Sequence, residues 1–188
     1  VALNLYQNRV TGAFKTDQLS ASEFGNTDPA YAQYTFVTTT PSNDRLTIRG
    51  LELEYTQHLS FLPGVLAGLN ARLSYTRNYA SVITANMSPH GVNGGLGWTF
   101  QRLSLYASAA WRDYVPLNSA NTSFNRHRMP IDVGGSIRIA RRVDLFFTGR
   151  NIRSEPVVTL QRNGNSAALP TTFEVTGAIW TLGLKGVW

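Results

Sequence analysis

Cysteine, long apolar runs and lysine are absent or scarce in this chain of 188 residues, and each shortage narrows the classes of protein that fit. Without cysteine the chain forms no disulfide bond and no thiolate metal site. No stretch approaches the roughly 18 consecutive apolar residues of a transmembrane helix. Charged residues make up only 15% of the chain, and Lys15 and Lys185 are the only lysines. The net charge of +6 therefore comes almost wholly from arginine.

The positive charge does not predict nucleic-acid binding, because the arginines are spread one or two to each expected strand. A nucleic-acid-binding protein gathers its basic residues in a patch or along a helix. The three histidines, His58, His90 and His127, lie in different connections and lack the spacing of metal ligands. No nucleophile and base can be paired by position. We therefore predict no nucleic-acid partner, no metal, no cofactor and no enzymatic activity.

Apolar and polar residues alternate along most of the chain, which is the period of a β-strand, and helical periodicity is nearly absent. Several of the alternating segments exceed the five or six residues usual in soluble sheets, and they are long enough to cross a bilayer at a tilt. The alternation predicts eight strands, at about 1–14, 44–59, 65–80, 91–101, 102–115, 128–140, 142–153 and 173–188.

Most of the expected strands have one apolar and one polar face. In the segment 102–115 the two faces are Leu103, Leu105, Ala107, Ala109 and Trp111 on one side, and Ser104, Tyr106, Ser108 and Arg112 on the other. Charged residues keep to the polar face. This is required if the apolar face meets lipid, where a central Arg or Lys costs about 2–4 kcal/mol. A half-buried strand of a soluble sheet has the same alternation, so one strand alone does not decide between the two.

Three positions depart from this pattern. Arg9 and Asp113 share the phase of the apolar residues in their segments, and we place both at the rim of the sheet, beyond the hydrocarbon. The phase also shifts around 48–51, where Gly50 predicts a β-bulge.

Short and long connections alternate along the chain. Three connections are tight, at 59–65, 100–102 and 140–142. Four are longer and polar, at about 15–43, 81–90, 116–127 and 154–172. This order puts all the tight turns at one end of the sheet. Short periplasmic turns and long extracellular loops are typical of outer-membrane barrels.

The charged residues of the polar faces are the candidates for contacts inside a barrel: Glu52, Glu54, Arg72, Arg112, Arg138, Arg150 and Lys185. The arginines and the lysine could mark the path of an anionic substrate. The preferred interpretation is that the two glutamates bond a neighbouring strand or a plug, and that the basic residues form salt bridges with plug carboxylates or hold water in the lumen. Three aromatic residues of the first long connection, Tyr31, Tyr34 and Phe36, could stack on a substrate or belong to an interfacial aromatic belt.

Several blocks of the sequence resemble the barrel of TonB-dependent outer-membrane receptors. The blocks are Thr47–Tyr55, Leu62–Leu69, Leu73–Thr76, Leu103–Arg112, Val143–Ile152 and Gly183–Trp188. Their order and spacing are similar to the C-terminal third of such a receptor, over essentially the whole chain. One departure is Glu174–Ala178, where members of the family often carry a Gly-Arg pair.

The resemblance implies an all-β fold: about eight strands of an antiparallel transmembrane β-barrel of 22 strands, with residues 1–188 as its C-terminal portion and the plug domain outside them. It implies a receptor in the Gram-negative outer membrane that imports a scarce extracellular substrate with energy from the TonB complex. The implied partners are outer-membrane lipid and lipopolysaccharide, the plug and the remaining barrel strands, and the TonB complex through an N-terminal region. The barrel-insertion machinery would recognise the apolar face of the last strand, Trp180, Leu182, Leu184 and Trp188.

Two other interpretations stay open. One is a self-contained outer-membrane barrel, since eight strands is an allowed number. The other is a soluble β-sandwich or lectin-like binding module, which would not need detergent. The pairing of the first and last strands separates the closed barrel from a barrel segment. Eight strands of a 22-stranded wall curve too gently to meet, so we expect the segments 1–14 and 173–188 not to pair.

Overall fold

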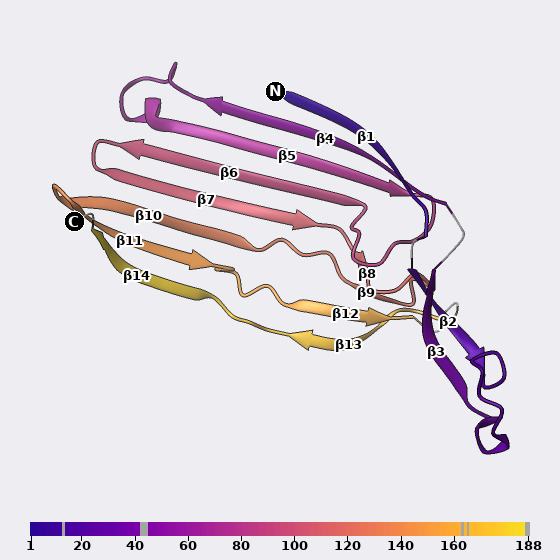
Figure 1. The fold of residues 1–188 in the computed structure, drawn as a ribbon. Helices are drawn as coiled ribbons and strands as arrows, with labels where there is room; N and C mark the ends of the chain where they lie inside the picture. Colours follow the sequence, from indigo (N-terminus) through magenta and orange to yellow (C-terminus); the bar gives the residue numbers. More distant parts are fainter. Residues whose placement is uncertain (13, 42–44, 163, 165, 187–188) are drawn as a thin grey trace.

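The computed structural model describes residues 1–12, 14–41, 45–162, 164 and 166–186. Eight antiparallel strands form its main sheet (Figure 1). Their order across the sheet is the same as their order along the chain. In spatial order they are β1 (Ala2–Val10), β4 (Leu46–His58), β5 (Leu69–Ala80), β6 (His90–Phe100), β7 (Leu103–Arg112), β10 (Ile131–Ala140), β11 (Val143–Arg150) and β14 (Ile179–Gly186). Each lies within or largely within a segment that the alternation predicts. The predicted all-β, antiparallel fold is confirmed.

The connections of the main sheet define its two ends (Figure 1). At the end that we call the turn end, short connections follow β4, β6 and β10, as predicted. At the opposite end, which we call the loop end, long connections follow β1, β5, β7 and β11. The turn after β6 is Gln101–Arg102, with Gln101 at a φ of 52°, a left-handed conformation that reverses the chain within two residues.

The main sheet is open. Among the described residues, β1 pairs only with β4 and β14 pairs only with β11. The expectation that the first and last strands do not pair is therefore confirmed. A closed eight-stranded barrel does not fit this arrangement, because closure requires those two strands to be neighbours.

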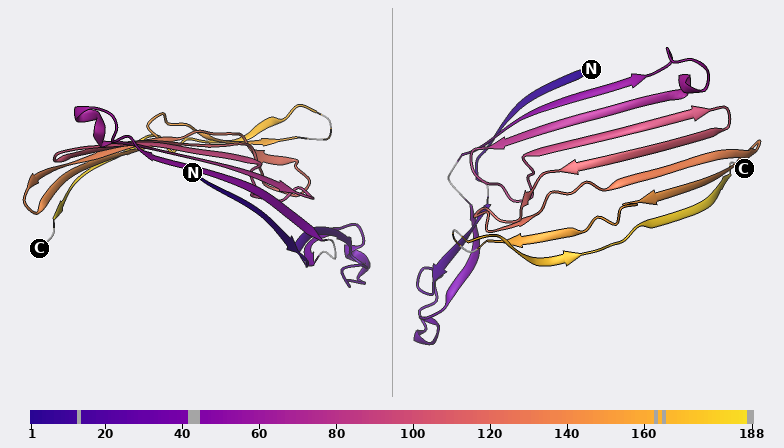
Figure 2. Two further views of the ribbon diagram at one scale, coloured as in Figure 1. Left: turned by 90° about the horizontal axis from the view of Figure 1, so that it is seen from above. Right: turned by 180° about the vertical axis from the view of Figure 1, so that it is seen from behind.

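Neither face of the main sheet is covered by a second layer (Figure 2). The loops add a four-stranded sheet and a hairpin, which lie toward the loop end (Figure 1). The small sheet contains β8 (Val115–Pro116), β9 (Ser123–Asn125), β12 (Val157–Gln161) and β13 (Leu169–Glu174), and the hairpin pairs β2 (Phe14–Ser20) with β3 (Thr35–Pro41). Among the described residues, Ala21 and Val158 are the only buried hydrophobic residues. A β-sandwich requires two sheets packed over an apolar core, so the sandwich interpretation is wrong.

Two predicted boundaries are wrong, and the loops contain strands that were not predicted. The segment 65–68 belongs to a 3-10 helix, η2 (Gly64–Gly68), because Pro63 and the positive φ of Gly64 turn the chain before β5 begins. The expected strand 173–188 is divided, since its first residues end β13 and Gly177, at a φ of 69°, separates them from β14. The long connections also contain the six strands of the loops, which the alternation does not predict. No helix among the described residues is long and apolar enough to span a membrane.

The β-bulge predicted at Gly50 is also absent. Pairing runs without a shift from β1 through β4 to β5, with Gly50 opposite Tyr6 on one side and Asn78 on the other. The ring of Tyr6 lies over Gly50, where a Cβ atom would come within 2.1 Å of the ring. The Tyr6 hydroxyl then donates a hydrogen bond to Oδ1 of Asn78 at 2.5 Å. Gly50 therefore makes room for an aromatic ring that spans three strands.

Candidate functional site

Strand pairing places the seven predicted charged residues on one face of the main sheet, which we call the polar face. Two examples show how the register does this. Glu52 faces Thr76, Thr76 faces Gly91, and Gly91 faces Arg112. Arg138 faces Asp144, and Asp144 faces Lys185. The opposite face, which we call the apolar face, carries most of the leucines, and they are strongly exposed: Leu5 is 68% and Leu182 is 73% exposed.

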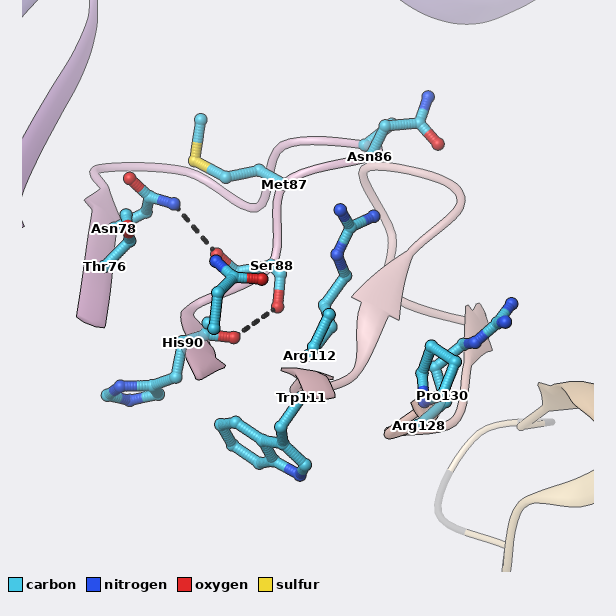
Figure 3. A pocket seen from close by; sticks show the side chains of 14 residues that line it. Thr76, Asn78, Asn86, Met87, Ser88, His90, Trp111, Arg112, Arg128 and Pro130 are labelled. Carbon is cyan, nitrogen blue, oxygen red and sulfur yellow. Dashed lines mark hydrogen bonds between the residues drawn. The ribbon is translucent and has the colours of Figure 1, made fainter. Parts of the chain in front are cut away.

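A hollow of about 660 Å³ lies where the polar face meets the loop end (Figure 3). Thr76, Asn93 and Arg112 of the sheet form its floor. The β5–β6 connection, with Asn86 and Ser88, closes one side. Figure 3 shows the Arg112 side chain on the same side as these loops, whereas the rings of Trp111 and His90 point to the other side of the sheet. Because successive side chains of a strand point to opposite faces of the sheet, the hollow lies on the polar face and the rings lie on the apolar face.

Hydrogen bonds hold the β5–β6 connection over this hollow. The Asn78 side chain donates to the Ser88 carbonyl at 3.1 Å, and the Asn78 amide donates to the Pro89 carbonyl at 2.8 Å. The Ser88 hydroxyl donates to the carbonyl of His90 at 2.9 Å. Farther along, the Asn86 amide donates to the Pro116 carbonyl at 2.7 Å, which fastens this loop to the next one. The wall of the hollow is therefore an ordered part of the fold.

Two arginines give the hollow its charge. Arg112, at the end of β7, and Arg128, in the following connection, exchange backbone hydrogen bonds of 2.9 and 3.0 Å as an isolated antiparallel bridge. No acidic residue lines the hollow, and among the described residues neither arginine forms an ion pair. Two guanidinium groups with amide and hydroxyl groups around them make a surface suited to carboxylate or other anionic oxygens.

A second hollow of about 460 Å³ continues toward the middle of the polar face. It shares Asn93, Ala110 and Pro130 with the first one, so the two form a continuous track. Its charged lining is mixed, with Glu54, Arg72 and Asp132. The side chain of Arg72 extends over Gly95, whose missing Cβ leaves space for it. The track is basic at the loop end and has both signs of charge farther in.

The other predicted polar residues do not gather in these hollows. Glu52 accepts a hydrogen bond from the Asn4 amide group at 3.1 Å. Arg138 and Asp144 form an ion pair at 3.3 Å between neighbouring strands, close to the turn end. Arg150 lies at the loop end of β11, and Lys185 lies near the end of β14. Of the seven residues, Glu54, Arg72 and Arg112 line the track.

The aromatic candidates of the first connection lie in the hairpin region, outside the main sheet. Phe36, in β3, stacks on Phe24 with ring centroids 4.7 Å apart. Tyr31 and Tyr34 pack near each other at 6.0 Å. In the same segment, hydrogen bonds from the side chain and the backbone amide of Ser20 lower the pKa of Glu23 below its usual value. These contacts order the tip of the hairpin. The stacking of Tyr31, Tyr34 and Phe36 on a substrate stays a prediction.

The last strand keeps its predicted apolar face. Trp180, Leu182 and Leu184 are exposed and lie opposite Gly149, Phe147 and Leu145. Trp188, the fourth residue of the predicted assembly signal, lies outside the described residues.

The residues that sequence reasoning missed lie in the connections. Asn86, Ser88 and Arg128 line the first hollow. No local pattern distinguishes Asn86 and Ser88 from other polar loop residues, and Arg128, the first residue of the predicted segment 128–140, lies before β10 begins. Arg128 comes next to Arg112 through pairing between β7 and a loop that follows it. Among the described residues, no group of three His, Cys, Asp or Glu residues is placed to hold a metal ion.

An open, single-layer antiparallel sheet with one exposed apolar face and one polar face defines the wall of a β-barrel rather than a sandwich. No protein-family model and no curated protein matches the sequence. Among solved structures, the chain is similar to the crystal structure of the siderophore receptor PiuA from Acinetobacter baumannii, with a TM-score of 0.61 and 16% sequence identity. The similarity covers 98% of this chain and 26% of that receptor, so the chain spans about a quarter of its length. At this identity the similarity concerns the fold.

Proposed function

We propose that this chain forms part of the barrel wall of a TonB-dependent receptor in the Gram-negative outer membrane, which imports a scarce extracellular substrate. The observation that carries the proposal is the exposed apolar face of a sheet without a core. Soluble monomers rarely expose contiguous apolar patches of more than a few hundred Å², whereas barrel strands alternate between lipid and lumen. The similarity to a siderophore receptor and the resemblance of the sequence blocks support the same assignment.

In this proposal the polar face lines the lumen and the loop end faces the outside of the cell. The track that begins at Arg112 and Arg128 then lies where an anionic group of a substrate, or a carboxylate of the plug, meets the barrel wall. A ferric siderophore is the first substrate class to test, because the structural neighbour is a siderophore receptor. We propose no enzymatic step for this face.

The orientation can be tested with single cysteines in the complete receptor, since residues 1–188 contain no cysteine of their own. Cysteine at Asn118, in a long connection, should react with a membrane-impermeant maleimide on intact cells. Cysteine at Gln101, in a tight turn, should react only after the outer membrane is opened. Equal labelling of both sites on intact cells would contradict the assigned orientation.

Transport is tested separately, with cells that carry or lack the complete receptor, each with and without TonB. Uptake of radioactive iron supplied as a ferric siderophore should require both proteins, while binding at the cell surface should require the receptor alone. Iron uptake that is unchanged without the receptor for every siderophore in a catecholate and hydroxamate panel would reject siderophore import. Uptake that does not depend on TonB would reject energised import.

A further inference from the structure

We propose that the second hollow is an inner binding position for an anionic ligand, held there by Arg72, and that the ligand reaches it from Arg112 and Arg128 at the loop end. The inference rests on the proposed function, because it needs the polar face to line the lumen. It goes beyond that function by assigning a route along one part of the wall and a residue that acts after the ligand has bound at the entrance.

The polar face is divided into rows, each made of residues that face one another across β5, β6 and β7. From the loop end inward, the rows are Thr76, Gly91 and Arg112; Ser74, Asn93 and Ala110; and Arg72, Gly95 and Ser108. Successive rows lie two residues apart, which is about 7 Å along the strands. Arg72 therefore lies about 14 Å farther from the loop end than Arg112. The middle row, between the two arginines, carries no charge.

The pair of arginines at the entrance is unfavourable without an anion. Arg112 and Arg128 face each other as a bridge, an arrangement that places Cβ atoms about 5 Å apart. Like charges directly opposite each other destabilise a sheet, and none of the described residues that line the first hollow is acidic. An anion that comes from the loop end is therefore attracted first to this pair.

Arg72 is placed over the inner row by a missing side chain. Its Nε atom lies 2.8 Å from the position that a Cβ atom of residue 95 would take, so Gly95 leaves the space that the arginine occupies. The side chain thus extends from β5 over β6, where it lines the second hollow. It is exposed, and among the described residues it forms no ion pair. Its guanidinium group is therefore available to an anionic oxygen.

Acidic residues flank this inner position. Glu54 lies opposite Ser74 in the middle row, and Asp132 lies opposite Ser108 in the inner row. One carboxylate oxygen of Asp132 accepts a hydrogen bond from the Asn151 amide at 2.8 Å. Both carboxylates repel an anion, so the inner position holds the ligand more weakly than the pair at the entrance does. A route requires this, because a ligand that binds must also be able to leave.

The two hollows leave room for a ligand between these positions. Their volumes of about 660 and 460 Å³ are typical of small-molecule sites. They share Asn93, Ala110 and Pro130, none of which is charged. The Asn93 amide group is already bonded to the Ser74 hydroxyl at 3.3 Å. This shared section therefore offers an anion passage rather than a charged partner.

The test uses the complete receptor in cells, with a ferric catecholate labelled with radioactive iron as the probe, because this complex carries net negative charge. In cells without TonB, Arg72→Gln should leave the Kd for binding at the cell surface unchanged. In cells with TonB, it should lower the maximal rate of uptake about tenfold, as expected for the loss of a hydrogen bond to a charged group. The variant R112Q/R128Q should instead raise the Kd about tenfold. Unchanged uptake or weakened surface binding in Arg72→Gln would overturn the proposal.

Glycine variants separate the position of the guanidinium group from its charge. Gly95→Ala keeps Arg72 but places a Cβ atom where its side chain lies, so uptake should fall while surface binding is retained. Gly94→Ala is the matched control, because its Cβ atom would meet only Leu73, at an ordinary distance of 3.8 Å. Arg150→Gln, outside both hollows, is the control for charge. An equal loss of uptake in either control would overturn the proposal.

The other possible occupant of the space beside Arg72 is a carboxylate of the plug. If Arg72 held the plug, Arg72→Gln would loosen it and admit a glycopeptide antibiotic too large for the intact outer membrane. We expect cells with this variant to remain as resistant as cells with the unchanged receptor, and greater sensitivity would overturn the proposal. Uptake of neutral ferric hydroxamates without uptake of the ferric catecholate would also overturn it, while leaving the receptor assignment in place. Uptake of neither kind of complex would instead reject the proposed function.

Discussion

Leu96 lies in the middle of β6 on the apolar face, between Ala71 and Ala107 of the neighbouring strands, and is 57% exposed. If this face meets lipid, Leu96→Arg should lower the free energy of unfolding by about 2–4 kcal/mol. Urea unfolding in lipid vesicles measures this cost.

The matched control is Asn93→Arg, on the polar face of the same strand. Asn93 donates to the Ser74 hydroxyl at 3.3 Å, and its replacement should cost about 0.5 kcal/mol because the polar face admits water. If arginine costs the same at both sites, the apolar face does not lie in hydrocarbon.

Asn151 combines an unusual backbone conformation with hydrogen bonds of its side chain. It follows β11 at a φ of 47°, and its side chain donates to the Glu155 carbonyl at 3.1 Å and accepts from the Glu155 amide at 2.9 Å. Its own amide donates to Asp132 of β10 at 2.8 Å. Asn151→Ala should destabilise this connection by about 2–4 kcal/mol, because it loses two hydrogen bonds and places alanine at positive φ.

Asn151→Gly separates the two causes, since glycine loses the same hydrogen bonds without the backbone strain. Hydrogen exchange of the amides at 152–154 should rise in both variants and rise more with alanine. The opposite order would show that the left-handed conformation is not a constraint at this residue.

At the scale of the element, β1 depends on one strand partner and one aromatic side chain. Tyr6 reaches across Gly50 to Asn78 and so ties β1 to β5 as well as to β4. Tyr6→Leu should loosen β1 by about 1–3 kcal/mol, through the lost hydrogen bond and the lost ring contact. Hydrogen exchange in 2–10 should therefore increase.

Tyr6→Phe should give an intermediate effect, since it removes only the hydroxyl. Gly50→Ala should resemble Tyr6→Leu although the tyrosine is kept, because the new Cβ takes the place of the ring. An unchanged exchange rate in Gly50→Ala would mean that the ring does not lie over residue 50.

The main strands are predictable because apolar and polar residues alternate in any strand whose sheet has one apolar and one polar face. Leu105 and Ser104 show this, since they lie opposite Trp98 and Thr99 on the two faces expected for them. Loop strands such as β9 escape prediction because β9 has only three residues and pairs with β12, far along the chain. Arg112 is found from its strand, whereas Arg128 joins it only through the fold. The shift of phase at Gly50 reflects the rim, where Arg49 takes an apolar-face position.

At the scale of the whole molecule, the open edges are the feature with the largest consequence. Backbone N–H and C=O groups of β1 and β14 that face away from their single partners have no hydrogen-bonded strand among the described residues. In lipid each unsatisfied group costs several kcal/mol. In the proposed receptor, further strands of the same barrel must therefore pair with both edges.

This arrangement can be tested by cross-linking within the complete receptor, after any cysteine outside residues 1–188 has been replaced, because residues 1–188 contain none. Leu5 and Leu51 lie opposite each other in β1 and β4, so the pair L5C/L51C should be joined efficiently by a short bifunctional maleimide. The pair L5C/L182C, on the two edge strands, should not be joined, because strands from elsewhere in the barrel separate them. A photoreactive residue at 182 should instead capture a segment outside residues 1–188. Efficient joining of L5C to L182C within one chain would show that the eight strands close on themselves, and the larger barrel would have to be abandoned.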